Sequence, residues 1–213
     1  TGYTNQFQNI GATKNMGVEL QLSGTIVNTK DLSYSASFNI SFNKNKITSL
    51  GPNKQILRNS GWFSANNFPA DYLLLVGEEV GAMYGYINDG WYTLDDFDAT
   101  PYSDPNYPQY NTSYTLKKGV VSNAGILANP LQPGPPKFRD LNGDGKVDAD
   151  NDRTIIGHAQ PKFFGGLSQT LTYKGFELTV FANFVYGNDV FNANKLEYGS
   201  AYGSQVNMLS SNN

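Results

Sequence analysis

The chain has 213 residues, a formal net charge of −3 and no cysteine. This charge gives no electrostatic footprint for nucleic acid, and the lack of cysteine excludes disulfide scaffolds and thiolate metal sites. Charged residues make up only 15% of the chain, whereas roughly 25% is usual in a soluble domain, and no apolar run reaches the ~18 residues of a transmembrane helix. The chain starts at Thr1 and shows no signal peptide, so we expect it to be a piece of a longer protein.

Four segments alternate between apolar and polar residues with a period of two, which predicts β-strands whose two faces meet different surroundings. They are 15–26, 32–43, 163–173 and 176–187. The link 28–31 joins the first two segments and Lys174-Gly175 joins the last two. Both links have the length and composition of hairpin turns. A strand that crosses a bilayer needs ~9–11 residues, and each segment supplies that length.

The two predicted hairpins, 15–43 and 163–187, are separated by a long connection, 44–162, that is rich in Gly, Pro, Asn and Asp. Tight turns at one end and a very long loop at the other are typical of an outer-membrane β-barrel, and residues 188–213 then begin the next loop. We therefore predict an all-β fold in which residues 1–213 form an antiparallel sector of one large transmembrane β-barrel domain with long extracellular loops.

The composition of the faces matters, because a soluble β-sandwich also alternates. No charged residue lies on the predicted apolar faces, and hydroxyl and amide side chains dominate the polar faces, as suits a hydrated lumen. Gln169 interrupts an apolar face, whereas Phe181 and Val185 interrupt a polar one. The aromatic residues near strand ends, where an interfacial girdle would place them, are Phe42, Phe163, Tyr173, Phe176 and Tyr186.

The sharpest local motif is DLNGDGKVD at 140–148. A calcium loop supplies oxygen ligands at positions 1, 3 and 5, a glycine at position 6 and a backbone carbonyl at position 7. The predicted ligands of Ca²⁺ are therefore Asp140, Asn142, Asp144, the carbonyl of Lys146, Asp148 and, as the closing acid, Asp152. The alternative is an acidic turn held by Asx-type hydrogen bonds.

The long connection also contains aromatic residues on which sugar rings could stack or peptides pack. The candidates for substrate contact are Trp62, Trp91 and Tyr92, and the alternative is that such residues form the connection's own small core. No catalytic set emerges, because His158 has no second histidine to support a triad. We expect no enzymatic activity and no required cofactor.

Short motifs that occur in order along the chain carry a family resemblance. They are NIG at 9–11, NMGVEL at 15–20, FNISFNKNKI at 38–47, VGE at 76–78, YGY at 84–86, DGWY at 89–92, the segment 140–157, Pro161, YKGF at 173–176 and YGND at 186–189. The chain resembles SusC/RagA-type TonB-linked outer-membrane proteins, although Glu79-Val80 stands where a proline is common in the G-x-P-x-G-x-x-Y-G loop entry of that family.

The resemblance implies a large importer in the outer membrane of a Gram-negative bacterium, with a plug inside the barrel, TonB as energy source and a SusD-like surface lipoprotein as lid. Its cargo would be oligosaccharides or peptides, and its barrel would contact membrane lipid. The plug and the TonB box are not recognised in this sequence, so we expect the chain to act as part of the importer. The alternative from the residues alone is a soluble β-sandwich surface binding module with a calcium-stabilised loop.

Overall fold

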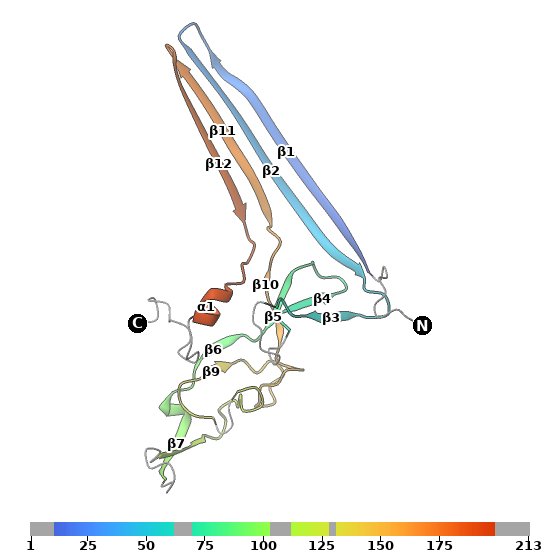
Figure 1. Cartoon of the computed structure of the whole chain (residues 1–213), viewed down its shortest axis with the longest axis vertical. Helices are drawn as coiled ribbons and strands as arrows, with labels where there is room; N and C mark the ends of the chain where they lie inside the picture. Colours follow the sequence, from blue (N-terminus) through green and yellow to red (C-terminus); the bar gives the residue numbers. More distant parts are fainter. Residues whose placement is uncertain (1–10, 62–69, 103–111, 128–130, 199–213) are drawn as a thin grey trace, which may run out of the picture. The chain divides into compact units, whose positions relative to one another are not determined.

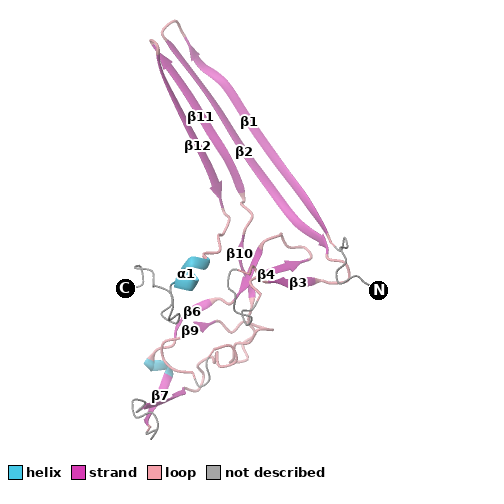
Figure 2. Cartoon of the chain, in the orientation of Figure 1, coloured by secondary structure: helices cyan, strands magenta, loops and turns pink. Residues whose placement is uncertain are grey.

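The computed structural model describes residues 11–61, 70–102, 112–127 and 131–198. Most of the regular structure is β-strand (Figure 1 and Figure 2). No helix in the described ranges is long and apolar enough to span a membrane. The chain divides into two compact units, residues 1–83 with 157–213 and residues 84–156, and each unit is described by itself.

The first unit contains a four-stranded sheet in the order β1-β2-β11-β12 (Figure 1). Its strands are β1 (Ala12–Asn28), β2 (Leu32–Ser49), β11 (Phe163–Tyr173) and β12 (Phe176–Tyr186). All neighbours pair antiparallel, so the predicted all-β antiparallel fold is confirmed. β1 and β2 contain 17 and 18 residues and run past the predicted segments. Lysines replace apolar residues beyond Phe42, while the backbone pairing continues to Ser49.

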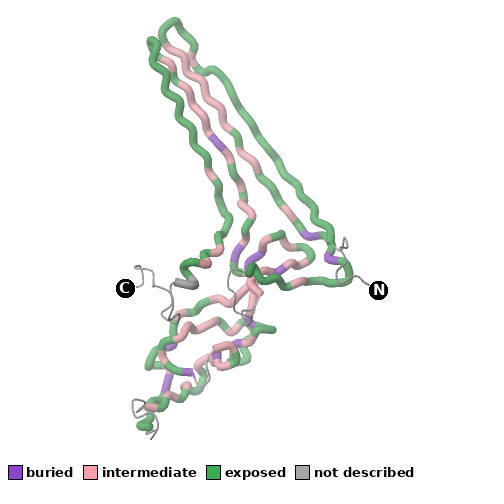
Figure 3. The backbone as a smooth tube through the Cα atoms, in the orientation of Figure 1, coloured by how far each residue is buried: buried purple, intermediate pink, exposed green. Residues whose placement is uncertain are grey.

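The register places the apolar residues of neighbouring strands on one face of the sheet. One such row is Leu22, Phe38, Leu167 and Ala182. These faces stay accessible, since Val18 is 70% exposed and Leu178 is 59% exposed, and Figure 3 shows the sheet exposed or half-buried along most of its length. A contiguous apolar face of this size is stable only against an apolar environment.

Gln169, the exception on the apolar face, has a partner within that face. It lies opposite Ala36 of β2 and Val180 of β12, and the hydroxyl of Tyr34 donates to its Oε1 at 2.7 Å. The hydrogen bond satisfies a polar group that would otherwise be costly in apolar surroundings. The face therefore tolerates this amide.

The exceptions on the polar face, Phe181 and Val185, lie at different levels of β12. Val185 is the cross-strand partner of Phe164, whereas Phe181 lies opposite Ser168. The three side chains are 67%, 61% and 42% exposed in the order Phe181, Val185 and Phe164. The polar face thus carries an accessible apolar pair, Val185 and Phe164, near the loop end of β12 and a separate exposed ring, Phe181, at the middle of the strand.

The turn between β11 and β12 has the backbone that a two-residue hairpin requires. Lys174 and Gly175 have φ values of 46° and 89°, and positive φ at both central residues is the conformation of a type I′ turn, whose twist matches the flanking strands. The amide of Lys174 donates to the carbonyl oxygen of Asp31 at 2.9 Å. This bond joins the turns of the two hairpins at the same end of the sheet.

The long connection contains short strands, each of 3–5 residues. They are β3 (Gln55–Arg58), β4 (Tyr72–Leu75), β5 (Ala82–Gly85), β6 (Asn88–Trp91), β7 (Phe97–Pro101), β8 (Thr112–Leu116), β9 (Pro136–Phe138) and β10 (Thr154–His158), with the 3₁₀ helix η1 (Leu94–Asp96); helix α1 (Ala193–Tyr198) follows β12. β10, β5, β4 and β3 form one sheet, β6 pairs with β9, and β7 pairs with β8.

The unit of residues 84–156 has its own small hydrophobic core. Tyr92, Phe97 and Leu131 are buried there. The ring of Phe97 lies 5.7 Å from that of Tyr92 and 6.1 Å from that of Tyr114, both edge to face. Much of the connection is therefore a folded unit rather than a structureless loop.

Candidate functional site

Aromatic rings border the apolar face of the four-stranded sheet at both of its ends. At the loop end, the ring of Phe163 lies 5.8 Å from Phe42 and 4.9 Å from Tyr186, centroid to centroid. At the turn end, Tyr173 is 49% exposed, and the ammonium of Lys174 lies 5.3 Å from the centroid of its ring. Rings that flank an apolar band on both sides fit the two interfaces of a bilayer.

The separation of these borders matches the thickness of a membrane interior. β11 and β12 contain 11 residues each, and such strands cover about 33 Å between first and last residue at ~3.3 Å per residue. At a tilt of ~40° the band is roughly 25 Å tall, which is the height of the apolar band on an outer-membrane barrel. The sheet can therefore cross such a membrane with its polar face directed away from lipid.

An open groove of about 470 Å³ lies where the apolar face ends on the loop side. Its lining includes Met16, Val18, Phe42, Lys44, Glu79 and Lys162. Because Met16 pairs with Lys44 and Val18 pairs with Phe42, part of the groove is the apolar face itself. The groove could not be recognised from the sequence. The feature that marks it there is Lys44, which follows Phe42 on the same face of β2.

His158, for which the sequence shows no catalytic partner, joins two other segments. Its Nδ1 lies 2.8 Å from Oε1 of Glu79, and its backbone N–H donates to Oδ2 of Asp189 at 2.8 Å. The imidazole stabilises the contact with Glu79 when Nδ1 carries a proton. These contacts give His158 a structural role at the end of β10.

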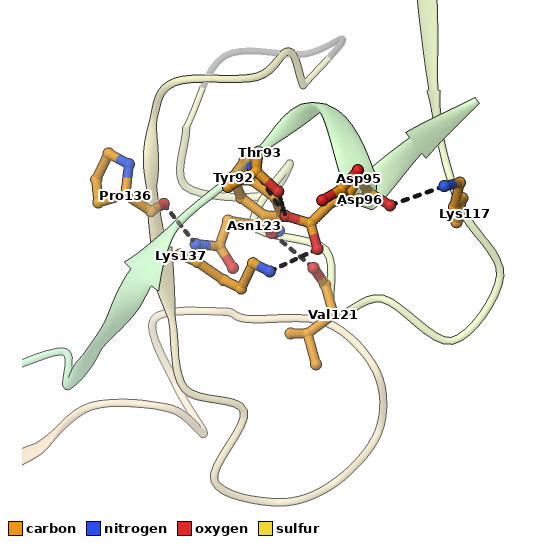
Figure 4. A network of polar contacts seen from close by, with 9 residues as sticks. All are labelled: Tyr92, Thr93, Asp95, Asp96, Lys117, Val121, Asn123, Pro136 and Lys137. Carbon is orange, nitrogen blue, oxygen red and sulfur yellow. Dashed lines mark hydrogen bonds and ion pairs between the residues drawn. The ribbon is translucent and has the colours of Figure 1, made fainter. Parts of the chain in front are cut away.

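Tyr92, one of the predicted substrate contacts, lies in the core with 2% of its surface exposed. Its hydroxyl donates to the carbonyl oxygen of Val121 at 2.6 Å and accepts the backbone N–H of Asn123 at 3.0 Å (Figure 4). Burial raises the pKa of Tyr92 above its ordinary value. In this position the ring is not accessible for stacking on cargo. Tyr92 instead fits the alternative interpretation, that aromatic residues of the connection form its own small core.

An ion pair stands beside Tyr92 in the same network (Figure 4). The ammonium of Lys137 lies 2.7 Å from Oδ1 of Asp96 and 5.2 Å from the centroid of the Tyr92 ring. The backbone N–H of Thr93 donates to the other oxygen of Asp96 at 2.9 Å. The hydrogen bonds from Lys137 and, second, from Thr93 hold the pKa of Asp96 below its ordinary value of 3.8.

The structure describes one of the two tryptophans predicted as substrate contacts. Trp91 ends β6 and is 62% exposed, so its ring is accessible to a ligand although its neighbour Tyr92 is buried. Trp62 lies outside the described residues. Trp91 is therefore the candidate that the geometry supports.

The acidic loop predicted to bind calcium is held by bonds from backbone amides to side-chain oxygens. Asp140 accepts the amides of Gly143 at 2.6 Å and Gly145 at 2.7 Å. Asn142 accepts the amide of Asp144 at 3.1 Å. The bond from Gly145 is the largest cause of a lowered pKa at Asp140. These are the Asx-type hydrogen bonds expected of the alternative interpretation, an acidic turn.

The rest of the loop is held in the same way. Asp152 is fully buried and accepts the amides of Leu141 at 2.8 Å and Asp148 at 2.7 Å, and Asp144 accepts the amide of Lys146 at 2.9 Å. Among the described residues, no three histidine, aspartate or glutamate side chains are grouped so that they could hold a metal ion. Calcium binding by this loop stays a prediction.

Known proteins are similar in sequence to this chain over nearly its whole length. TonB-dependent receptor P39 of Formosa agariphila is 32% identical over 203 residues, which cover 90% of this chain and 18% of that protein. TonB-dependent receptor P3 of the same organism is 30% identical over 202 residues, with 94% and 18% covered. The chain belongs to the TonB-dependent receptor family. No protein-family model matches it.

A further TonB-dependent receptor and one solved structure are also similar to this chain. TonB-dependent receptor SusC of Bacteroides thetaiotaomicron is 24% identical over 172 residues, or 81% of this chain and 14% of SusC. The solved structure of the RagAB peptide transporter matches the fold over 87% of this chain and 16% of that chain, with a TM-score of 0.50 and 21% identity. The chain spans less than a fifth of the length of these relatives.

Membership of the TonB-dependent receptor family gives the four-stranded sheet its context. The sheet is one sector of a large antiparallel β-barrel, and its outer strands β1 and β12 have open edges within the described chain. The relatives are named as receptors and a transporter. The chain is accordingly not an enzyme, as the sequence predicts.

Proposed function

We propose that this chain forms part of the wall and the loops of an outer-membrane importer that is energised by TonB and takes up oligosaccharides or peptides. The observation that carries the proposal is the exposed apolar face, which aromatic rings border about one membrane thickness apart. The opposite face, rich in hydroxyl and amide groups, then lines the interior of the barrel.

The soluble β-sandwich is supported less well. A sandwich buries the apolar faces of two sheets against each other at a separation of ~10 Å. Here all four long strands belong to one sheet, and their apolar side chains remain exposed. The alternative therefore lacks the second layer that it needs among the described residues.

We infer that the connection between the hairpins lies on the outer side of the membrane. The two hairpin turns are short and joined to each other through Lys174 and Asp31, as is usual for periplasmic turns, so the long connection emerges at the opposite end. A SusD-like lipoprotein would cover this side. Trp91, exposed beside the core of residues 84–156, offers a ring on which a sugar or peptide can pack.

Uptake by the full-length receptor tests the function. A strain that lacks the receptor should lose uptake of its labelled oligosaccharide or peptide, and the wild-type gene should restore it. Trp91→Ala should reduce the restored uptake, whereas Leu94→Ala, which removes another exposed apolar side chain (65% exposed), should not. A receptor that fractionates with soluble proteins would contradict the proposal itself, and equal uptake by the two variants would contradict only the role of Trp91.

We also propose that the acidic loop binds Ca²⁺, with the ligands predicted above. The support is the spacing of its oxygen-bearing residues, and the carboxylates repel one another unless a cation is present. In the full-length receptor, calcium should slow proteolysis between residues 135 and 157, and replacing Asp140 and Asp144 by Ala should abolish this protection. The control replaces the exposed Asp95 and Asp98 by Ala. Equal protection with chelator and with calcium would contradict the proposal.

A further inference from the structure

Three lysines continue the apolar face past its aromatic border. The register places Lys44 opposite Met16 and Lys46 opposite Lys14. Residues that oppose each other share a face, and the face alternates with every residue. All three lysines are exposed and lie on the same side of the sheet as Phe42. The lipid-facing surface therefore ends in positive charge at its loop end.

A fourth lysine joins this group from the neighbouring strand. Lys162 lies immediately before β11 and lines the same groove as Lys44. Its backbone N–H donates to the carbonyl oxygen of Tyr186 at 2.8 Å, and its methylene groups lie beside Gly187, where an added Cβ would approach them to 2.8 Å. The backbone hydrogen bond thus holds Lys162 in place at the loop end of the sheet. We refer to Lys14, Lys44, Lys46 and Lys162 as the lysine cluster.

The charge of the lysine cluster is not balanced within the described chain. None of the four ammonium groups forms an ion pair with a described carboxylate. Glu79, which also lines the groove, contacts His158. Like charges directly opposite each other destabilise a strand pair, and Lys14 and Lys46 are such a pair. An anion bound between them would relieve this repulsion.

The position of the lysine cluster matches the headgroup layer of a bilayer. Lys44 and Lys46 follow Phe42 on the same strand and face, and at ~3.3 Å per residue with a tilt of ~40° they lie roughly 5–10 Å beyond the aromatic border. The polar layer on each side of the hydrocarbon is about 5–8 Å deep. Lysine side chains also extend along apolar surfaces to place their charge in this layer.

We infer that the lysine cluster and its groove bind a phosphate-bearing lipid of the outer leaflet. Acyl chains would pack on Met16, Val18 and Phe42, and the phosphate groups would meet the ammonium groups above them. This inference rests on the proposed function, because it requires the apolar face to lie in a membrane. An acidic protein would match the charge but not the apolar floor of the groove, which is continuous with the band below it. Clustered lysines beside a membrane attract anionic headgroups.

Lipid binding by the purified full-length receptor tests the inference. The probe is lipid A with both phosphates, compared with its dephosphorylated form, and bound lipid is counted by native mass spectrometry after delipidation. The wild type should prefer the phosphorylated probe, and replacing Lys14 and Lys46 by Ser should weaken its binding by roughly tenfold or more. The matched control replaces Lys54 and Lys118, two exposed lysines outside the cluster, and should bind like the wild type.

Heat-modifiable mobility in gels verifies that each variant is a folded barrel, and the milder variant Lys44→Gln replaces any that is not. Equal binding by the cluster and control variants overturns the inference while leaving the importer intact. Equal binding of both probes by the wild type overturns it too, as does a cluster variant that keeps the lipid but loses an acidic partner protein. A receptor that needs no detergent to stay in solution overturns the proposed function together with the inference.

Discussion

Replacing Leu22 by Lys should prevent assembly of the barrel, whereas the same change at the next residue, Ser23, should be tolerated. Leu22 lies opposite Phe38 on the apolar face and is 59% exposed, while Ser23 lies opposite Ser37 on the polar face. Leu22 is roughly 10 Å below the loop-side border of a band that is about 25 Å tall. It therefore faces lipid close to the middle of the membrane.

At that depth a lipid-facing lysine costs ~2–4 kcal/mol, which lowers the ratio of folded to unfolded barrel by roughly 30- to 900-fold. Folding of the full-length receptor into lipid vesicles measures this ratio, with urea titration and the gel mobility of unheated samples as readouts. Two further neighbouring pairs, Phe38 with Asn39 and Val180 with Thr179, repeat the comparison on β2 and β12. If lysine were tolerated equally on both faces, the assignment of the faces would be refuted.

Three other changes test the packing. Gly165→Ala should destabilise the barrel by ~1–3 kcal/mol in the same urea titration, because the new Cβ would clash with the backbone carbonyl oxygen of Asn39 on β2 and would stand 2.7 Å from Cζ of Phe184 on β12; a neutral result would contradict the close approach of β11 to these two strands. Gly175→Ala should cost ~1–2 kcal/mol, since φ is 89° there, and an unchanged midpoint would exclude the type I′ turn. The depressed pKa of Asp96 predicts stability that is present above its ordinary pKa of 3.8 and lost as the pH falls below it. Hydrogen exchange in residues 84–156 should therefore increase on acidification, and Asp96→Asn should remove the part of this dependence that comes from the contact with Lys137.

The strands of the barrel sector could be predicted from the sequence because each face meets one kind of surroundings over many residues. The tight turn could also be predicted, because a two-residue link with glycine at its second position suits a hairpin turn. The partner of Gln169 could not be predicted, because the hydroxyl of Tyr34 comes from another strand and reaches it only in the correct register. The short strands of the connection were missed, since strands of 3–5 residues hold too few positions for a period of two to be recognised.

For the candidate sites, the sequence predicts the residue types but not their burial or their neighbours in space. Composition identified aromatic residues in the connection, but only the fold separates the buried Tyr92 from the exposed Trp91. Neighbouring residues point in opposite directions on a short strand, and a single sequence does not show which direction is inward. The groove was missed because its lining unites β1, β2 and the segments around Glu79 and Lys162, which are far apart in the chain.

The pairing of β2 with β11 has a consequence for the order in which the receptor folds. Each hairpin closes through neighbours in sequence, but Ser41 pairs with Phe164, and closing a disordered segment of roughly 120 residues costs about 2 kcal/mol more than closing one of ten. Early collapse of residues 84–156 around Tyr92 and Phe97 would shorten the flexible chain that has to be closed. Folding of residues 84–156 would then speed the pairing of β2 with β11, and variants that loosen the core of this unit should slow insertion even where the finished barrel is equally stable.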